Sequence, residues 1–166
     1  ELRKLRKFIN LVHNNAKKNS ILTQWKQDIT KWFNKYKYFN IPWDNDIKCI
    51  GVEIEGIKCF KSATRPWKIP LIVRYKNNEE KIINLLVKFE DVRKDKLTMI
   101  ISKLLNKVCK KLIDIKTYNV FPISVNSGWI EMIDETQTLY DIKYRYNTTL
   151  QNYIMDFNPN LTIIDM

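Results

Sequence analysis

The sequence predicts an α+β fold in which a helical lead-in precedes a five-stranded antiparallel sheet with one packed helix. Apolar residues recur every three or four positions through the first 37 residues, which is the spacing of amphipathic helices. From Ile47 onward they alternate with polar residues, as in strands, and one further helical stretch separates three predicted strands from two. A chain of 166 residues is long enough for one domain with a buried core.

The first predicted region is helical and spans Glu1 to about Lys37. Two apolar series repeat at helical spacing: Leu2, Leu5, Phe8, Ile9 and Val12, then Ile21, Leu22, Trp25, Ile29, Trp32 and Phe33. The polar stretch Asn14–Ser20 interrupts the pattern, so we expect two helices or a kinked pair. Pro42 breaks the helical region because a proline disfavours helical geometry in the residue before it.

Three strands, a helix, two strands and a final helix are predicted after this region. The first three strands lie around Ile47–Ile57, Leu71–Tyr75 and Lys81–Lys88, where apolar and polar residues alternate. Helical spacing returns over Asp91–Leu112. Two short strands, Tyr118–Val125 and Trp129–Ile133, follow around a tight turn, and Tyr140–Met155 is predicted to be helical.

The composition narrows the classes of function. The net charge is +11, and residues 1–50, with 11 basic and 4 acidic side chains, carry +7 of it. This excess suits a solvated basic face, and direct nucleic-acid binding is not expected because no recognition helix or base-stacking motif is evident. No apolar run reaches the ~18–20 residues of a membrane span. The three cysteines are unevenly spaced and are interpreted as core thiols.

The stretch FKSATRPWKI, Phe60–Ile69, joins two predicted strands. Ser62, Thr64 and Arg65 place small hydroxyls, backbone amides and one cation in a tight turn. Groups of this kind can hold a phosphate. Ser, Thr and Pro also join many ordinary hairpins, so this motif has little specificity by itself.

The stretch LLVKFEDVRKDKLTM, Leu85–Met99, contains a strand that ends in a lysine and the start of a helix. Lys88 is followed by Glu90-Asp91-Val92-Arg93-Lys94-Asp95. Acidic groups in the first turn of a helix are stabilised by the helix dipole. A lysine is a long, mobile point charge, which suits contact with a phosphate.

The stretch TYNVFPISVNSGWIEMIDETQTL, Thr117–Leu139, contains the last two predicted strands and the segment that follows them. Binding of an adenine ring needs an apolar slot and, beside it, a backbone acceptor and donor on an extended segment. By itself, the pattern Tyr-x-Val-x-Pro-Ile in this stretch is typical of a buried strand.

In this order and spacing, the three motifs resemble the amino-terminal lobe of a kinase of the phosphatidylinositol 3-kinase-related family, closest to the ATR and TOR types. They span Phe60–Leu139, about half of the chain. The resemblance implies that residues 47–139 form the kinase small lobe and its hinge. Residues 1–46 would be the end of a helical FAT-like region, and residues 140–166 would begin a truncated C-lobe.

The resemblance also assigns residues to ATP binding. Those near the phosphates are Ser62, Thr64, Arg65, Lys88 and Asp95, the last as the ion-pair partner of Lys88. Those around the adenine are Tyr118, Ile130 and the hinge residues Glu131, Met132 and Ile133. The expected cofactors are ATP and Mg or Mn. No catalytic residue and no metal ligand is expected in this chain, because both belong to the other lobe.

One departure from the family pattern concerns the lysine. Aligned without a gap on the acidic motif, the family lysine falls on Val87, and Lys88 is one residue late. A one-residue deletion between Lys88 and Glu90 restores the register, and this is the interpretation that we adopt. The alternative is a weakened nucleotide site, because side chains alternate across a strand.

The function that the resemblance implies is that of a serine/threonine protein kinase in DNA-damage checkpoint or growth signalling, of which this chain alone is inactive. The expected partners are a protein substrate, the rest of a large kinase polypeptide and its regulatory subunits. The expected location is nuclear, with the cytoplasm as alternative. A lipid kinase of the phosphatidylinositol 3- or 4-kinase type and a non-catalytic pseudokinase scaffold stay open.

Overall fold

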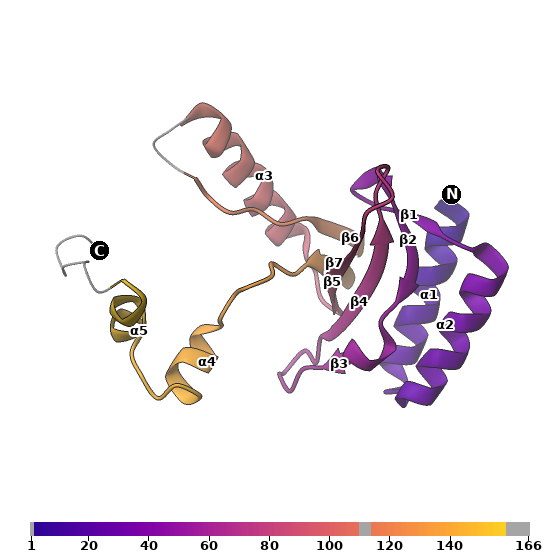
Figure 1. Ribbon diagram of the computed structural model, residues 1–166, viewed down its shortest axis with the longest axis horizontal. Coiled ribbons are helices and arrows are strands. Elements are labelled where there is room, and N and C mark those ends of the chain that lie inside the picture. The colour runs from indigo at the N-terminus through magenta and orange to yellow at the C-terminus, as the bar shows by residue number, and fades with distance from the viewer. Residues whose placement is uncertain (1, 110–113, 159–166) are drawn as a thin grey trace. The chain divides into compact units, whose positions relative to one another are not determined.

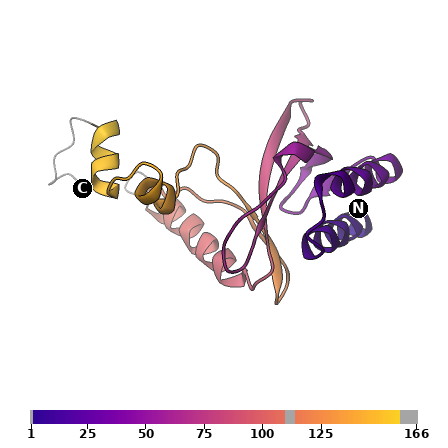
Figure 2. The same ribbon diagram turned by 90° about the horizontal axis from the view of Figure 1, so that it is seen from below.

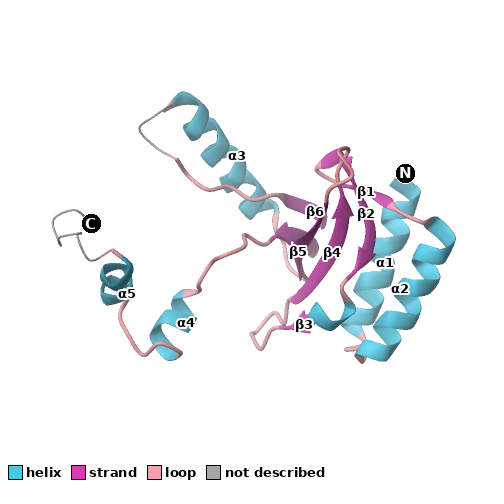
Figure 3. Cartoon of the chain, in the orientation of Figure 1, coloured by secondary structure: helices cyan, strands magenta, loops and turns pink. Residues whose placement is uncertain are grey.

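The computed structural model of the chain describes residues 2–109 and 114–158. Two units are present, Glu1–Met132 and Ile133–Met166. Helices come first in the chain and an antiparallel sheet follows, which confirms the predicted α+β class (Figures 1 and 3). The sequence suggests boundaries after residues 46 and 139, whereas the structure places the helical lead-in and the sheet in one unit that ends at Met132.

Two helices, α1 (Leu2–Lys17) and α2 (Leu22–Tyr36), lie side by side on one face of the sheet (Figures 1 and 2). The predicted interruption is present, but it is shorter than Asn14–Ser20 because α1 continues to Lys17. Asn19 takes a positive φ of 51° in the connection, a conformation that asparagine tolerates better than most residues. Most residues of the two apolar series are buried in the core shared with the sheet, as amphipathic spacing predicts, but Leu2, Ile21 and Leu22 at the beginning of the series are exposed.

The sheet is entirely antiparallel and runs in the order β1-β2-β4-β5-β7-β6, with β3 paired to β4. Its strands are β1 (Phe39–Ile41), β2 (Asp44–Val52), β3 (Lys58–Cys59), β4 (Trp67–Arg74), β5 (Glu80–Lys88), β6 (Val120–Ser124) and β7 (Ser127–Glu131).

The predicted number of five strands is wrong, because the described residues form a sheet of seven. Pro42 does end the helical region, but the three residues before it form β1, and the turn at Pro42 and Trp43 joins β1 to β2. The single strand predicted over Ile47–Ile57 is divided into β2 and β3 by a 3₁₀ turn at Ile54–Gly56. Apolar alternation continues across this turn, so the pattern alone did not reveal the break.

Aromatic side chains join the helix pair to the sheet. Phe8 of α1 is fully buried, and its ring lies 5.2 Å from that of Trp32, 4.6 Å from that of Phe39 and 6.3 Å from that of Trp129. Tilted and edge-to-face geometries at these distances are favourable for aromatic rings. Phe8 therefore joins α1, α2, β1 and β7 in one core.

Helix α3 (Arg93–Val108) follows β5 and contacts the sheet through β6. Figures 1 and 2 show it extending away from the sheet on the side opposite α1 and α2. The sequence predicts a single helix packed on the sheet over Asp91–Leu112, and residues 110–112 lie outside the described part. The helices that cover the sheet are instead α1 and α2, since all large apolar residues of α3 except Met99 are exposed.

The second unit contains two short helices, α4 (Leu139–Tyr144) and α5 (Leu150–Phe157), where one helix over Tyr140–Met155 is predicted. Thr138 and Thr149 cap the two helices, each hydroxyl accepting a hydrogen bond from a backbone N–H three residues later. Asn147, at φ 51°, separates them. Among residues 2–109 and 114–158, no helix is long and apolar enough to cross a bilayer.

Replacing Phe8 by Ala should destabilise the first unit by about 3–5 kcal/mol, because it removes the ring shared by the helix pair and the sheet. Leu2→Ala in the same helix is the control, since Leu2 is 83% exposed and its loss should cost less than about 0.5 kcal/mol. Urea unfolding followed by tryptophan fluorescence measures both changes. Equal midpoints for the two variants would contradict the assignment of Phe8 to the core.

Candidate functional site

Lys88 ends strand β5 on the sheet face that α1 and α2 leave uncovered. Side chains alternate across a strand, and Leu85 and Val87 are buried in the core shared with the helix pair. Leu86 and Lys88 therefore point to the opposite side, which we call the open face. Val87, the position of the lysine in an ungapped alignment, is fully buried, so Lys88 is the basic residue at this strand end that faces outward.

Strand register brings further residues to the open face. Lys68 pairs with Leu86, Leu86 pairs with Ile130, and Lys88 pairs with Gly128. Directly opposed residues in antiparallel strands carry their side chains on the same face. Leu86 thus lies in one row between Lys68 of β4 and Ile130 of β7, with Lys88 two residues further along β5.

A small apolar cluster occupies part of the open face next to Lys88. Its buried members are Val92, Val120 and Ile130, and the partly buried residues packed against them are Leu86, Met99 and Tyr118. The structure therefore brings Tyr118 and Ile130, the two predicted adenine-contacting side chains, into one cluster with Leu86. Leu86 was missed by the sequence motifs, although its position two residues before Lys88 places it on the same side of the strand.

The ammonium of Lys88 forms an ion pair with Glu90, at 2.6 Å between Nζ and Oε1. The sequence predicts Asp95 as the partner of Lys88. Asp95 lies in the first turn of α3 and is half-buried, but the ion pair is made by Glu90 instead. Glu90 is only two residues from Lys88 in the chain, so its carboxylate can reach the ammonium before the helix begins. The side chains of Lys88 and Glu90 are 23% and 36% exposed, so water screens the pair only in part.

The loop that carries Ser62, Thr64 and Arg65 connects β3 to β4, and all three residues are exposed. Its ends are joined by a hydrogen bond from Phe60 N to Pro66 O, and a turn is closed by Arg65 N donating to Ser62 O. Arg65 takes a positive φ of 43°. The loop is thus a closed hairpin end whose hydroxyls and guanidinium are accessible to solvent.

The predicted hinge residues are divided between the two units. Glu131 ends β7, and its carboxylate accepts hydrogen bonds from the backbone N and the side-chain Nδ2 of Asn119, at 3.0 and 2.6 Å. Met132 donates its backbone N–H to Asn84 O. Ile133 is the first residue of the second unit, and its carbonyl accepts a hydrogen bond from Thr136.

The start of α3 is held by an Asp91–Arg93 pair. The guanidinium of Arg93 donates to both carboxylate oxygens of Asp91, and the backbone N–H of Arg93 donates to Oδ1 at 3.0 Å. These hydrogen bonds lower the pKa of Asp91 to about 2. Since the folded pKa is depressed, the contribution of Asp91 to the helix start is present above its ordinary pKa and is lost as pH falls towards 2.

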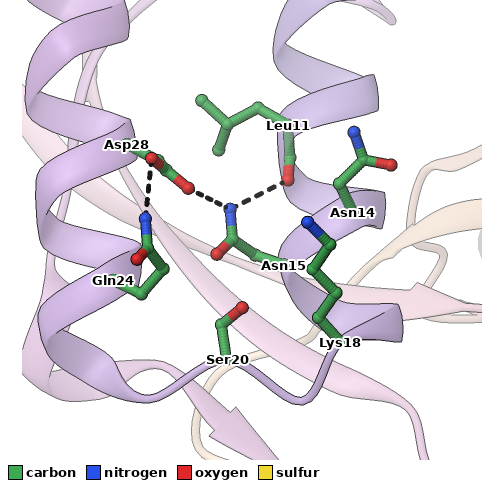
Figure 4. A pocket seen from close by; sticks show the side chains of 7 residues that line it. All are labelled: Leu11, Asn14, Asn15, Lys18, Ser20, Gln24 and Asp28. Carbon is green, nitrogen blue, oxygen red and sulfur yellow. Dashed lines mark hydrogen bonds between the residues drawn. The ribbon is translucent and has the colours of Figure 1, made fainter.

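A cavity of about 500 Å³ lies elsewhere, at the end of the α1–α2 pair (Figure 4). Asn15, which is buried, donates from Nδ2 to Asp28 Oδ2 at 2.9 Å and to Leu11 O at 3.2 Å, and Gln24 donates to the other oxygen of Asp28. The Asn15–Asp28 hydrogen bond joins the two helices beside the cavity, and the other two are formed within α1 and within α2. Sequence reasoning missed this feature, although Asn15 and Asp28 are polar residues next to apolar helical positions.

The three cysteines are predicted to be core thiols, but only Cys49 is buried, and Cys59 and Cys109 are partly exposed. All three cysteines are free, and burial raises the pKa of the Cys49 thiol well above its ordinary value. Within the described residues, no group of three or more His, Cys, Asp or Glu side chains is arranged to hold a metal ion.

A comparison with protein-family models and with curated proteins finds no match to this chain.

Gly128→Ala should destabilise the junction between the sheet and α3 by about 1–3 kcal/mol. A Cβ at this position would overlap Val92 Cγ2 and lie 3.1 Å from the carbonyl oxygen of Phe121. Gly51→Ala in β2 is the control, because the new Cβ would meet Ile72 Cδ1 at an ordinary 3.4 Å. Thermal unfolding of both variants measures the difference, and equal destabilisation would contradict the close approach of Val92 to Gly128.

Arg93→Gln should raise the pKa of Asp91 from about 2 towards the ordinary ~3.9, because the charged donor is lost. Arg74→Gln is the matched control, since Arg74 pairs with Glu80 on another element and its loss should leave Asp91 unchanged. Carboxyl carbon shifts followed by NMR between pH 1.5 and about 6 report both titrations. An Asp91 pKa that stays near 2 in Arg93→Gln would show that Arg93 is not the cause.

Proposed function

We propose that the first unit is the nucleotide-binding small lobe of an ATP-dependent serine/threonine protein kinase of the phosphatidylinositol 3-kinase-related family. The single observation that carries the proposal is the position of Lys88 on the open face, in the same strand as Leu86 and beside the Leu86–Ile130 pair. A cation next to an apolar patch on a rigid sheet matches the two halves of a nucleotide, the phosphates and the base.

The proposed binding mode uses residues from both sides of the open face. Adenine would lie against Leu86, Tyr118 and Ile130, which already form one apolar cluster. The phosphates would lie near Lys88, under the loop that carries Ser62, Thr64 and Arg65. Lys68, opposite Leu86 in the register, adds a second positive charge to this face.

The remaining parts of the proposal concern groups outside this chain. Phosphoryl transfer requires Mg or Mn ligands and a base for the substrate hydroxyl, which the resemblance assigns to the other lobe of the kinase. A protein substrate, regulatory subunits and a nuclear role in damage or growth signalling belong to the same proposal. By itself this chain would bind nucleotide without transferring phosphate.

A non-catalytic lobe is the second candidate, and the Lys88–Glu90 ion pair favours it. Glu90 places a negative charge 2.6 Å from the ammonium, which opposes the approach of an anionic phosphate. In an ATP-binding lobe, the phosphates must displace Glu90 from Lys88. In a scaffold, the ion pair would persist and would serve to hold the strand to the start of α3.

Lys88→Met should weaken MgATP binding by about tenfold or more, since a hydrogen bond to a charged group contributes about 1.5–3 kcal/mol. Lys81→Met is the matched control: it lies at the other end of β5, exposed and paired with Glu79, and its loss should leave affinity unchanged. Isothermal titration calorimetry of the 166-residue chain with MgATP measures both.

Glu90→Gln separates the two candidates. If Glu90 only competes with phosphate, its neutralisation should tighten MgATP binding. Absence of binding by the wild type, by Glu90→Gln and by the control would reject the nucleotide site and leave the scaffold. Equal affinities of wild type and Lys88→Met would reject Lys88 as the phosphate contact.

A further inference from the structure

Helix α3 carries its apolar residues on its outer side. Six large apolar side chains, which we call the α3 stripe, are between 42% and 79% exposed: Leu97, Ile100, Ile101, Leu104, Leu105 and Val108. Their spacing of three, four and seven residues places them on one side of the helix. An amphipathic helix normally buries this side, so the α3 stripe has the composition of a packing surface without its partner.

The opposite side of α3 is the one attached to the rest of the unit. Asp95, Met99, Ser102 and Asn106, also at helical spacing, are the residues of the helix that are buried or half-buried. Asn106 donates to Ile115 O at 2.7 Å and accepts from Ile115 N at 2.8 Å. These two hydrogen bonds join this side of the helix to the segment that leads into β6, so the polar side of α3 is the one held against the rest of the unit.

A row of lysines runs along one edge of the α3 stripe. Lys96, Lys103 and Lys107 are exposed and repeat at spacings of seven and four residues, which places them on one flank. Helix α3 contains five basic residues and one acidic residue, Asp95. The surface therefore combines an apolar centre with a positively charged margin.

We propose that the α3 stripe is a docking surface for an acidic amphipathic helix of a partner protein. Leu, Ile and Val at these spacings form the ridges that pack into the grooves of a second helix. Acidic residues flanking the partner's apolar side would pair with the lysine row and set the orientation of the partner.

Two other occupants fit these observations less well. A second copy of α3 would bring the same excess of positive charge against the lysine row, which opposes self-association. A membrane surface is disfavoured because the α3 stripe contains no Trp, Tyr or Phe, the residues that anchor helices at the lipid interface. This proposal does not depend on nucleotide binding at the open face and can be tested independently of it.

The test uses a synthetic peptide of about five helical turns with Leu at alternating third and fourth positions and Glu elsewhere. A matched peptide has Lys in place of every Glu. Fluorescence anisotropy with the 166-residue chain should show binding of the Glu peptide and none of the Lys peptide, and added salt should weaken the binding. Hydrogen exchange on α3 should slow only with the Glu peptide.

Variants of exposed residues locate the binding surface. Leu104→Gln should weaken binding of the Glu peptide by about tenfold, because one large apolar side chain is lost from the contact. Val125→Gln is the matched control, an equally exposed apolar residue in the β6–β7 turn, and should bind as the wild type does. The double variant Lys96→Glu/Lys107→Glu should lose the Glu peptide and gain the Lys peptide.

Four outcomes would overturn the proposal. The first is equal binding of the two peptides, and the second is equal affinity of Leu104→Gln and wild type for the Glu peptide. The third is a concentration-dependent dimer that Leu104→Gln abolishes, seen by sedimentation, which would assign the surface to a second copy. The fourth is binding to phosphatidylserine-containing vesicles with no binding of the Glu peptide, which would assign it to a membrane.

Discussion

The helix pair α1–α2 covers one face of the sheet and shares its core with that face, and this burial determines which side chains point to the other face. Phe8, Trp25 and Trp32 from the helices meet Phe39 and Trp129 from the sheet in one continuous core. Side chains alternate across β5, so a residue of this strand next to a core position points to the open face, whereas a bulge between Cys49 and Gly51 interrupts the alternation in β2. The position of Lys88 follows from this constraint, because its neighbour Val87 is in the core.

Helix α3 is attached to the rest of the first unit near both of its ends. Val92 packs against Gly128 at the beginning of the helix, and Asn106 binds the backbone of Ile115 near its end. Between these points the helix turns a mainly polar side inward. The same arrangement brings Asp95 to the inner side and leaves the α3 stripe on the outer side of the helix.

The positive charge of Lys88 is already paired with the carboxylate of Glu90 in the structure, so an anion that binds Lys88 has to compete with Glu90. Glu90 and Lys88 form one ion pair, and the residues that follow, Asp91 and Arg93, form a second. Four consecutive charged groups are thus arranged as two local ion pairs. An incoming phosphate would compete with one carboxylate at Lys88, and the remaining charge of Lys68 on the same face would favour that exchange.

The helices α1 and α2, the second half of β4, strand β5 and part of β7 could be predicted from sequence, because hydrophobic periodicity reports directly which side of an element is buried. Residues Trp67–Ile69, which the sequence analysis placed in the stretch between two strands, belong to β4. Strands β1 and β3 could not, since each depends on pairing with a neighbouring strand and has too few residues to show a period. The spacing also grouped Leu97 and Leu104 correctly on one side of a helix.

Which side of that helix faces the sheet was decided only by tertiary structure, through the contacts of Val92 and the hydrogen bonds of Asn106. The partner of Lys88 was decided in the same way. The sequence offers Glu90, Asp91 and Asp95 within seven residues, and only the path of the chain between β5 and α3 selects Glu90. Local periodicity determines which residues of one element share a face. Which residues of different elements contact each other depends on distances in the folded structure, which a local sequence pattern does not report.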